Sequence, residues 1–153
     1  MPVLVLWGLT ASSKEELFAR VHEELWRRGQ VHPSYLAGVQ ERERQYPTGL
    51  DFGEFAVALP HVDFEHVIRP ALVVALLSQP LPFQAMDDPT RQHLCQLAIF
   101  PVLTSGDTQL AFLQAVTCAL QQPGFYARLI SLQTPQEIAA CLQSMLLLSS
   151  QED

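Results

Sequence analysis

Apolar residues recur at helical spacing in the first third of the chain. Residues 12–28 predict an amphipathic helix that Ser12 or Ser13 caps and Gly29 ends. Its apolar face is made up of Leu17, Val21, Leu25 and Trp26. A second helix is predicted over residues 33–44, with Tyr35, Leu36 and Val39 turned inward.

The pattern then changes to short apolar runs that are typical of strands. Pro47-Thr48-Gly49 breaks the chain, and strands are predicted over residues 55–60, 71–77 and 93–103. The second run has almost no polar alternation, which favours a strand covered on both faces. Residues 78–91 are rich in proline and aspartate, so we expect a turn or loop there.

Helical periodicity returns after residue 107. One helix is predicted to end at Pro123-Gly124, residues 125–132 predict a short helix or turn, and Thr134 with Pro135 predicts the start of a last helix. The inward residues of the two longer helices are expected to be Leu110, Leu113, Val116, Leu120, Ile138, Leu142, Met145 and Leu146. The order of elements predicts a single α/β domain over residues 1–153, in two or three layers.

Composition narrows the possible functions. The chain has 48% hydrophobic and 16% charged residues, which predicts a globular protein, and a net charge of −7 argues against nucleic-acid binding. We find no membrane-spanning stretch and interpret the N-terminus as lacking a signal peptide, so a cytoplasmic protein is expected. Cys95, Cys118 and Cys141 are widely spaced in apolar surroundings, which predicts buried free thiols.

Chemistry is expected around His61. The common nucleotide-binding, serine-hydrolase and zinc-protease motifs are absent. If the chain stays extended, His61, Asp63 and Glu65 fall on one side, and His66 would complete a metal site. The same residues also fit a solvated strand exit without chemistry, or a catalytic histidine whose neutral imidazole attacks phosphorus. These three interpretations stay open at this point.

Residues before His61 fit the third interpretation. Pro60 has no N–H, so it ends a regular ladder and helps to aim the next side chain out of the sheet. Arg42 and Arg44 lie one turn before the chain break, and a guanidinium group matches phosphate geometry.

Arg42-Glu43, Thr48-Gly49 and the run Ala56-Val57-Ala58-Leu59-Pro60-His61 together form a recognisable pattern. It resembles the enzyme IIA domains of the fructose–mannitol class in the bacterial phosphotransferase system, and most of all their galactitol-specific branch. The resemblance implies an α/β fold with a mixed, mainly five-stranded sheet flanked by helices, the mannitol-type enzyme IIA fold.

The resemblance also implies a role for particular residues. His61 would accept a phosphoryl group from the phosphocarrier HPr and pass it to a cysteine of a IIB subunit. Arg42 would pair with the phosphoryl oxygens and Thr48 would lie near the site, with no cofactor or metal required. A IIC membrane permease would belong to the same system, and the chain itself would not insert into the membrane.

One position departs from the family pattern. Mannitol and fructose members have a second histidine near the active one, and the matching position here is Gln109, which can donate a hydrogen bond but carries no charge. This agrees with the galactitol-like interpretation. The alternative is a regulatory, nitrogen-type IIA paralogue whose phosphorylation state controls partner binding. In either case Phe52, Phe55, Val62 and Phe64 are expected to rim the site.

Overall fold

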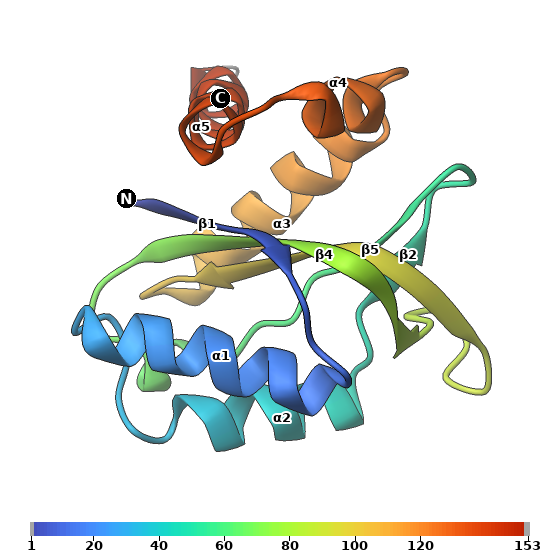
Figure 1. Ribbon diagram of the computed structural model, residues 1–153. Coiled ribbons are helices and arrows are strands. Elements are labelled where there is room, and N and C mark those ends of the chain that lie inside the picture. Colours follow the sequence, from blue (N-terminus) through green and yellow to red (C-terminus); the bar gives the residue numbers. More distant parts are fainter. Residues whose placement is uncertain (1, 152–153) are drawn as a thin grey trace.

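A mixed five-stranded sheet forms the centre of the molecule (Figure 1). The computed structural model describes residues 2–151, and side chains as far as residue 143. The strands are β1 (Val3–Leu9), β2 (Gly49–Asp51), β3 (Ala56–Ala58), β4 (Ala71–Gln84) and β5 (Gln92–Val102). Their spatial order is β1-β4-β5-β3-β2, with β1 parallel to β4, β3 parallel to β5, and the other neighbours antiparallel. The predicted fold class is therefore confirmed.

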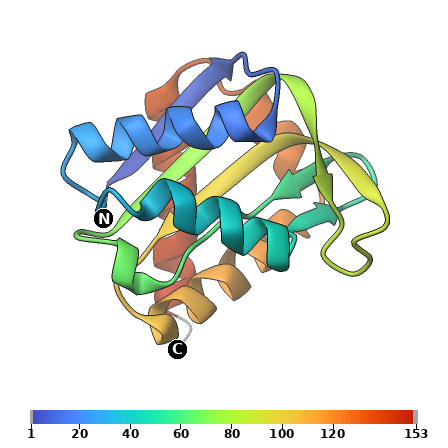
Figure 2. The ribbon, with the colours of Figure 1, turned by 90° about the horizontal axis from the view of Figure 1, so that it is seen from below.

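Helices cover both faces of the sheet, so the molecule has three layers. Helices α1 (Lys14–Arg27) and α2 (Tyr35–Gln45) lie side by side on one face (Figures 1 and 2). Helices α3 (Gly106–Leu120), α4 (Phe125–Ser131) and α5 (Pro135–Gln151) lie on the other. Each face has its own apolar core, because successive strand residues point to opposite sides of the sheet.

The first helix forms where the sequence predicts it. Ser13 caps α1, its hydroxyl accepting a hydrogen bond from the N–H of Glu16 at 3.1 Å. Leu17, Val21 and Leu25 are fully buried against the sheet. The prediction for Trp26 was wrong, since this residue is 50% exposed at the edge of the apolar stripe.

The helices on the other face differ from expectation in one residue. Phe112, Val116 and Leu120 form the buried stripe of α3, whereas Leu110 is 60% exposed. Phe112, Val116 and Leu120 are spaced four residues apart along one face of the helix, and Leu110 lies off that face. Thr134 caps α5 as expected, and Ile138 and Leu142 are buried. Met145 and Leu146 lie outside the described side chains.

The strand β4 extends well beyond its predicted end, so the expected loop over residues 78–91 was wrong in its first half. Pairing with β5 is interrupted between Leu76 and Leu81, and resumes up to Gln84. Beyond Leu77, β4 has only β5 as a neighbour, because β1 has ended. Prolines are tolerated where a strand has a free side or a bulge, which explains how Pro80 and Pro82 lie within β4.

Two strands were not predicted. The N-terminal apolar run forms β1, an edge strand that pairs with β4 alone. The segment after the chain break forms the short strand β2, antiparallel to β3. Gly49 in β2 passes very close to the end of β4, since a Cβ at this position would lie 2.7 Å from the carbonyl oxygen of Gln84.

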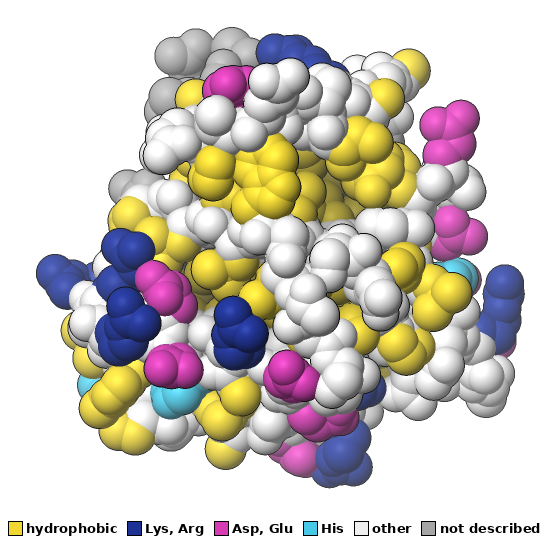
Figure 3. Space-filling view, viewed as in Figure 1, with side chains coloured by type: hydrophobic (Ala, Val, Ile, Leu, Met, Phe, Trp, Pro, Cys, Tyr) yellow, Lys and Arg dark blue, Asp and Glu magenta, His cyan; other side chains and the backbone are white. Residues whose placement is uncertain are grey.

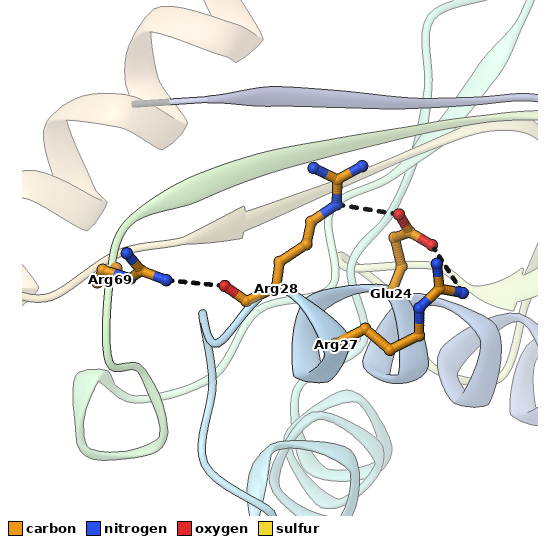
Figure 4. A network of polar contacts seen from close by, with 4 residues as sticks. All are labelled: Glu24, Arg27, Arg28 and Arg69. Carbon is orange, nitrogen blue, oxygen red and sulfur yellow. Dashed lines mark hydrogen bonds and ion pairs between the residues drawn. The ribbon is translucent and has the colours of Figure 1, made fainter.

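Arginine side chains join the end of α1 to the start of β4 (Figure 4). Glu24 forms ion pairs with Arg27 at 3.9 Å and Arg28 at 3.0 Å. Arg69 donates a hydrogen bond to the backbone carbonyl of Arg28 at 2.8 Å, where the helix leaves its carbonyls without helical partners. The network links the end of α1 to the segment that leads into β4.

Apolar side chains also reach the surface between the sheet and the helices α4 and α5, where Figure 3 shows a hollow lined with hydrophobic residues. Within the described part of the chain, no helix is both long enough and apolar enough to cross a membrane.

Candidate active site

The segment that follows β3 presents a histidine beside the sheet. β3 ends at Ala58, and Leu59, Pro60 and His61 continue as irregular chain. The side chain of His61 is only 9% exposed, and its Nδ1 lies 2.8 Å from the carbonyl oxygen of Leu59. A carbonyl can only accept, so Nδ1 carries the proton and Nε2 keeps its lone pair. The ring is therefore held as a nucleophile at Nε2.

A buried hydrogen-bond network fixes Leu59. Its backbone N–H donates to the hydroxyl of Thr48 at 3.0 Å. The same hydroxyl donates to Glu43 Oε2 at 2.8 Å, and the N–H of Thr48 donates to Glu43 Oε1 at 3.0 Å. Glu43 and Thr48 are 3% and 2% exposed. Thr48 therefore acts on His61 indirectly, through the backbone of Leu59. The sequence predicted neither this indirect contact nor a role for Glu43.

Arg42 projects from the last turn of α2 toward the segment that carries His61. Its Nη1 lies 3.6 Å from Asp63 Oδ1, and its guanidinium group lies over the ring of Tyr46, 4.7 Å from the ring centre. Its Nε is buried and has no hydrogen-bond partner among the described residues. The Arg42 side chain is 36% exposed, so the structure holds a partly solvent-exposed cation beside the histidine segment.

The surroundings keep His61 neutral. Burial lowers the pKa of the imidazole below its ordinary value, and the positive charge of Arg42 acts in the same direction. The Leu59 carbonyl and the Asp63 carboxylate act in the opposite direction. Because burial is the largest of these effects, the pKa is lowered on balance, and the neutral form predominates at pH 7.

His61 lines a shallow groove of about 460 Å³ between the sheet and α3. Leu50, Leu59, Met86, Leu113, Gln114, Thr117, Cys118 and Gln121 complete its lining. None of these side chains is charged. Gln109 lies one turn before Leu113 on α3, is partly exposed, and is not among the lining residues. The groove on α3 was not predicted, because no motif marks the residues that form it.

Cysteine burial was predicted correctly for only one residue. All three cysteines lie in the described part of the chain as free thiols, Cys95 buried, Cys141 partly buried and Cys118 exposed. Cys118 is exposed because it lies outside the buried stripe of Phe112, Val116 and Leu120 and lines the groove instead.

The extended continuation beyond His61 does not form. Residues Phe64–His66 make a single turn of 3-10 helix, so Glu65 does not share a side with His61 and Asp63. His66 is partly buried, with its ring against Gly38 and its Nδ1 2.8 Å from the hydroxyl of Ser34. Within residues 2–143 no group of three potential ligand side chains is close enough to hold a metal ion. The structure therefore gives no support to a metal site built from these residues.

The four residues expected at the rim fall into different environments. Phe64 is 56% exposed, whereas Val62 is buried in the core. Phe52 and Phe55 are partly buried and stack on each other, with ring centres 5.1 Å apart, and Phe55 also stacks on Tyr126. Only Phe64 is both largely exposed and close in the chain to His61.

Fold and site together define a class of protein. It is a small α/β protein in which a neutral imidazole, fixed at Nδ1 and open at Nε2, faces an uncharged groove beside an arginine. Such a site suits nucleophilic attack on an anionic group, because it has a nucleophile and a charge partner.

Comparison with known proteins identifies the family. The model of the phosphoenolpyruvate-dependent sugar phosphotransferase system EIIA 2 family matches residues 2–145. The chain belongs to this family, and it is accordingly a phosphotransferase component of the EIIA type.

Curated relatives carry several sugar specificities. The galactitol-specific EIIA component of Escherichia coli K12 is 26% identical over 129 residues, which cover 84% of this chain and 85% of that protein. The 2-O-alpha-mannosyl-D-glycerate-specific EIIABC component of the same organism is 32% identical over 133 residues, covering 86% of this chain but 20% of that protein.

Solved structures share the fold. The IIA mannitol protein of E. coli has a TM-score of 0.69 at 23% identity, covering 88% of this chain and 92% of that one. The E. coli enzyme IIA for mannitol in complex with phosphorylated enzyme IIB has a TM-score of 0.61 at 24% identity, covering 77% and 78%.

Proposed function

We propose that the chain is the phosphocarrier enzyme IIA of a sugar or polyol phosphotransferase system, with His61 as the phosphoryl acceptor. The observation that carries this proposal is the hydrogen bond from His61 Nδ1 to the Leu59 carbonyl, which leaves a lone pair on Nε2. The lowered pKa of the ring supports it, because a protonated imidazole cannot attack phosphorus. We take residues 1–153 as one cytoplasmic domain that serves this purpose.

Transfer at His61 balances without a metal or cofactor. The Nε2 lone pair forms a bond to phosphorus as the phosphorus–nitrogen bond to the histidine of phospho-HPr breaks, and the bonding electrons return to that imidazole. In the second step a cysteine thiolate of the IIB subunit attacks the same phosphorus and His61 leaves. The proton stays on Nδ1, hydrogen-bonded to the Leu59 carbonyl, throughout both steps, so His61 needs no separate base.

Arg42 supplies the positive charge that this step requires. Its side chain is 36% exposed and contacts Asp63 through Nη1, and a fork of donors suits the non-bridging oxygens of a phosphoryl group. Thr48 acts through the backbone of Leu59 rather than by touching the phosphoryl group. We place Gln109 at the edge of the site as a neutral hydrogen-bond donor for a docked partner.

We further propose galactitol as the sugar of the system, with a IIC permease as its membrane component. The E. coli galactitol-specific EIIA component supports this, because it matches over most of both chains. The absence of a second histidine at position 109 is in keeping with it. HPr as donor and IIB as acceptor would use the uncharged groove in turn, since both must reach the same nitrogen.

Reconstitution tests the assignment. The purified chain is incubated with labelled phosphoenolpyruvate, enzyme I and HPr, and should acquire an acid-labile, alkali-stable phosphate. His61→Ala should abolish the label, whereas His32→Ala, which alters an exposed histidine, should retain it. Label that persists in His61→Ala would refute the assignment.

A second stage separates transport from regulation. The phosphorylated chain is mixed with IIB subunits of the galactitol, mannitol and fructose systems, and discharge of the label is followed. Fast discharge to the galactitol IIB alone supports the proposal. A labelled chain that discharges to none of them would favour the regulatory, nitrogen-type alternative.

A further inference from the structure

Glu43 is a buried carboxylate that the proposed transfer does not use. It is 3% exposed and follows Arg42 on α2, with its side chain turned into the protein. Burial raises its pKa, and the two hydrogen bonds from Thr48 act in the opposite direction. A carboxylate in such a place is costly unless its oxygens are paired, so its partners indicate what it does.

The partners of Glu43 lead to His61 in three steps. The carboxylate accepts the Thr48 hydroxyl at 2.8 Å, and the hydroxyl accepts the Leu59 N–H at 3.0 Å. The Leu59 carbonyl in turn accepts His61 Nδ1–H at 2.8 Å. All four residues are buried, so no bulk water competes for these groups.

The carboxylate sets the direction of the whole chain of bonds. A hydroxyl has a single proton, and Thr48 gives it to Glu43, which leaves the hydroxyl lone pairs for the Leu59 N–H. Leu59 lies just past the last paired residue of β3, and Pro60 has no N–H to offer. The Thr48 hydroxyl therefore anchors the backbone N–H of Leu59, the residue whose own carbonyl holds His61.

We propose that Glu43 is a positioning residue for His61. It orients the Thr48 hydroxyl, thereby anchors Leu59, and so keeps the imidazole as the Nδ1–H tautomer with Nε2 open to phosphorus. This inference rests on the proposed function of His61. It extends that function to a side chain that reaches the ring only through Thr48 and Leu59.

A purely structural role would look different. In that case Glu43 would only hold the turn at residues 46–48 to the end of α2, and replacing it would change stability without changing the ring. The tautomer of His61 separates the two roles, because it reports on Nδ1 and Nε2 directly. It can also be measured without any phosphoryl donor.

Glu43→Gln is the informative variant, since it keeps the shape and removes the charge. Its amide NH₂ replaces Oε2 and faces the Thr48 hydroxyl as a donor, so the 2.8 Å bond is lost and the hydroxyl keeps only the 3.1 Å contact with the remaining oxygen as an acceptor for its proton. Glu41→Gln is the matched control, because Glu41 is an exposed carboxylate on the same helix that pairs with Arg44. The tautomer is read from the ring ¹⁵N shifts, with His61→Gln identifying the resonances.

The expected result is a rise in the Nε2–H tautomer of His61 in Glu43→Gln. Phosphorylation by phospho-HPr should slow about tenfold in kcat with KM unchanged, as is usual when a partner that orients a histidine is lost. Glu41→Gln should match the wild type in both measurements. A folded Glu43→Gln protein with the wild-type tautomer and rate would overturn the inference.

A second pair of variants covers the case in which Glu43→Gln fails to fold. Thr48→Ser keeps the hydroxyl and should keep the Nδ1–H tautomer, whereas Thr48→Val should lose it. An unchanged tautomer in Thr48→Val would equally overturn the inference. If wild-type protein is never labelled on His61, the proposed function fails instead, and the tautomer result still stands by itself.

Discussion

Replacing Thr48 by valine should destabilise the protein far more than the loss of one hydroxyl usually does. The hydroxyl donates to the Glu43 carboxylate at 2.8 Å and accepts the Leu59 N–H at 3.0 Å, and all three groups are buried. Valine has nearly the same shape, so packing is retained. What is lost is a partner for a buried carboxylate oxygen and a partner for a buried N–H.

The expected magnitude follows from these two groups. An unpaired buried N–H costs about 1–3 kcal/mol, and a lost hydrogen bond to a charged group costs about 1.5–3 kcal/mol. Relaxation of Leu59 recovers part of this, so we expect the free energy of unfolding to fall by about 2–5 kcal/mol. This is a large part of the stability of a typical domain, which is about 5–15 kcal/mol.

Urea denaturation at pH 7 followed by circular dichroism measures this difference. The matched control is Thr117→Val, in which the hydroxyl donates only to the Leu113 carbonyl one turn back in α3. Such a bond adds little to a helix, so the control should change the free energy of unfolding by no more than about 0.5 kcal/mol. If Thr48→Val costs no more than Thr117→Val, the buried network does not stabilise the fold and the reasoning is refuted.

Three further outcomes are expected. Arg42→Lys should keep the positive charge but lose the planar fork of donors, so phosphorylation of His61 should slow about tenfold or more while the circular dichroism spectrum stays unchanged. A rate equal to that of the wild type would show that the charge alone suffices. The rate should also be constant above about pH 6.5, the ordinary histidine pKa, and decline only at lower pH, because burial and then Arg42 lower the pKa of His61. A rate plateau that begins only above pH 7 would contradict the lowered pKa. The free energy of unfolding should change with pH in the same direction, because the folded protein binds this proton less tightly than the unfolded chain. The contribution of His61 to stability is therefore complete above about pH 6.5 and is lost as the pH falls through the folded pKa. Gly49→Ala should lower the free energy of unfolding by about 1–3 kcal/mol, because the added Cβ would lie 2.7 Å from the carbonyl oxygen of Gln84, and a melting temperature equal to that of the wild type would show that this end of β4 moves freely.

The sequence was sufficient to predict the fold class and to single out His61 as the candidate site residue. Strands such as β3 and β5 are short apolar runs between turn residues, and α1 has both a cap and a regular apolar stripe. These signals are local, so they can be read without knowing what packs against them. Pro60 before His61 is a local signal of the same kind.

Other features depend on contacts between distant parts of the chain. The strand β4 continues through Pro80 and Pro82 only because β1 has ended beside it, which no local pattern shows. Glu43 resembles any charged residue of an amphipathic helix until Thr48 folds back onto it. The groove on α3 likewise needs β2 and the end of β4 opposite it before Leu113 and Thr117 line anything.

The edge strand β1 has a consequence for how the chain folds. Val3 pairs in parallel with Leu72, and the whole of β1 has no other strand to join. On the ribosome the first strand therefore stays unpaired until the segment that contains β4 has emerged, with both helices α1 and α2 already synthesised between them. The entropy of closing so long a loop is lost before the contacts of the parallel pair form, and this slows folding. During that interval an apolar strand without a single charged residue is open to other chains, so β1 is where misassembly of this protein should begin.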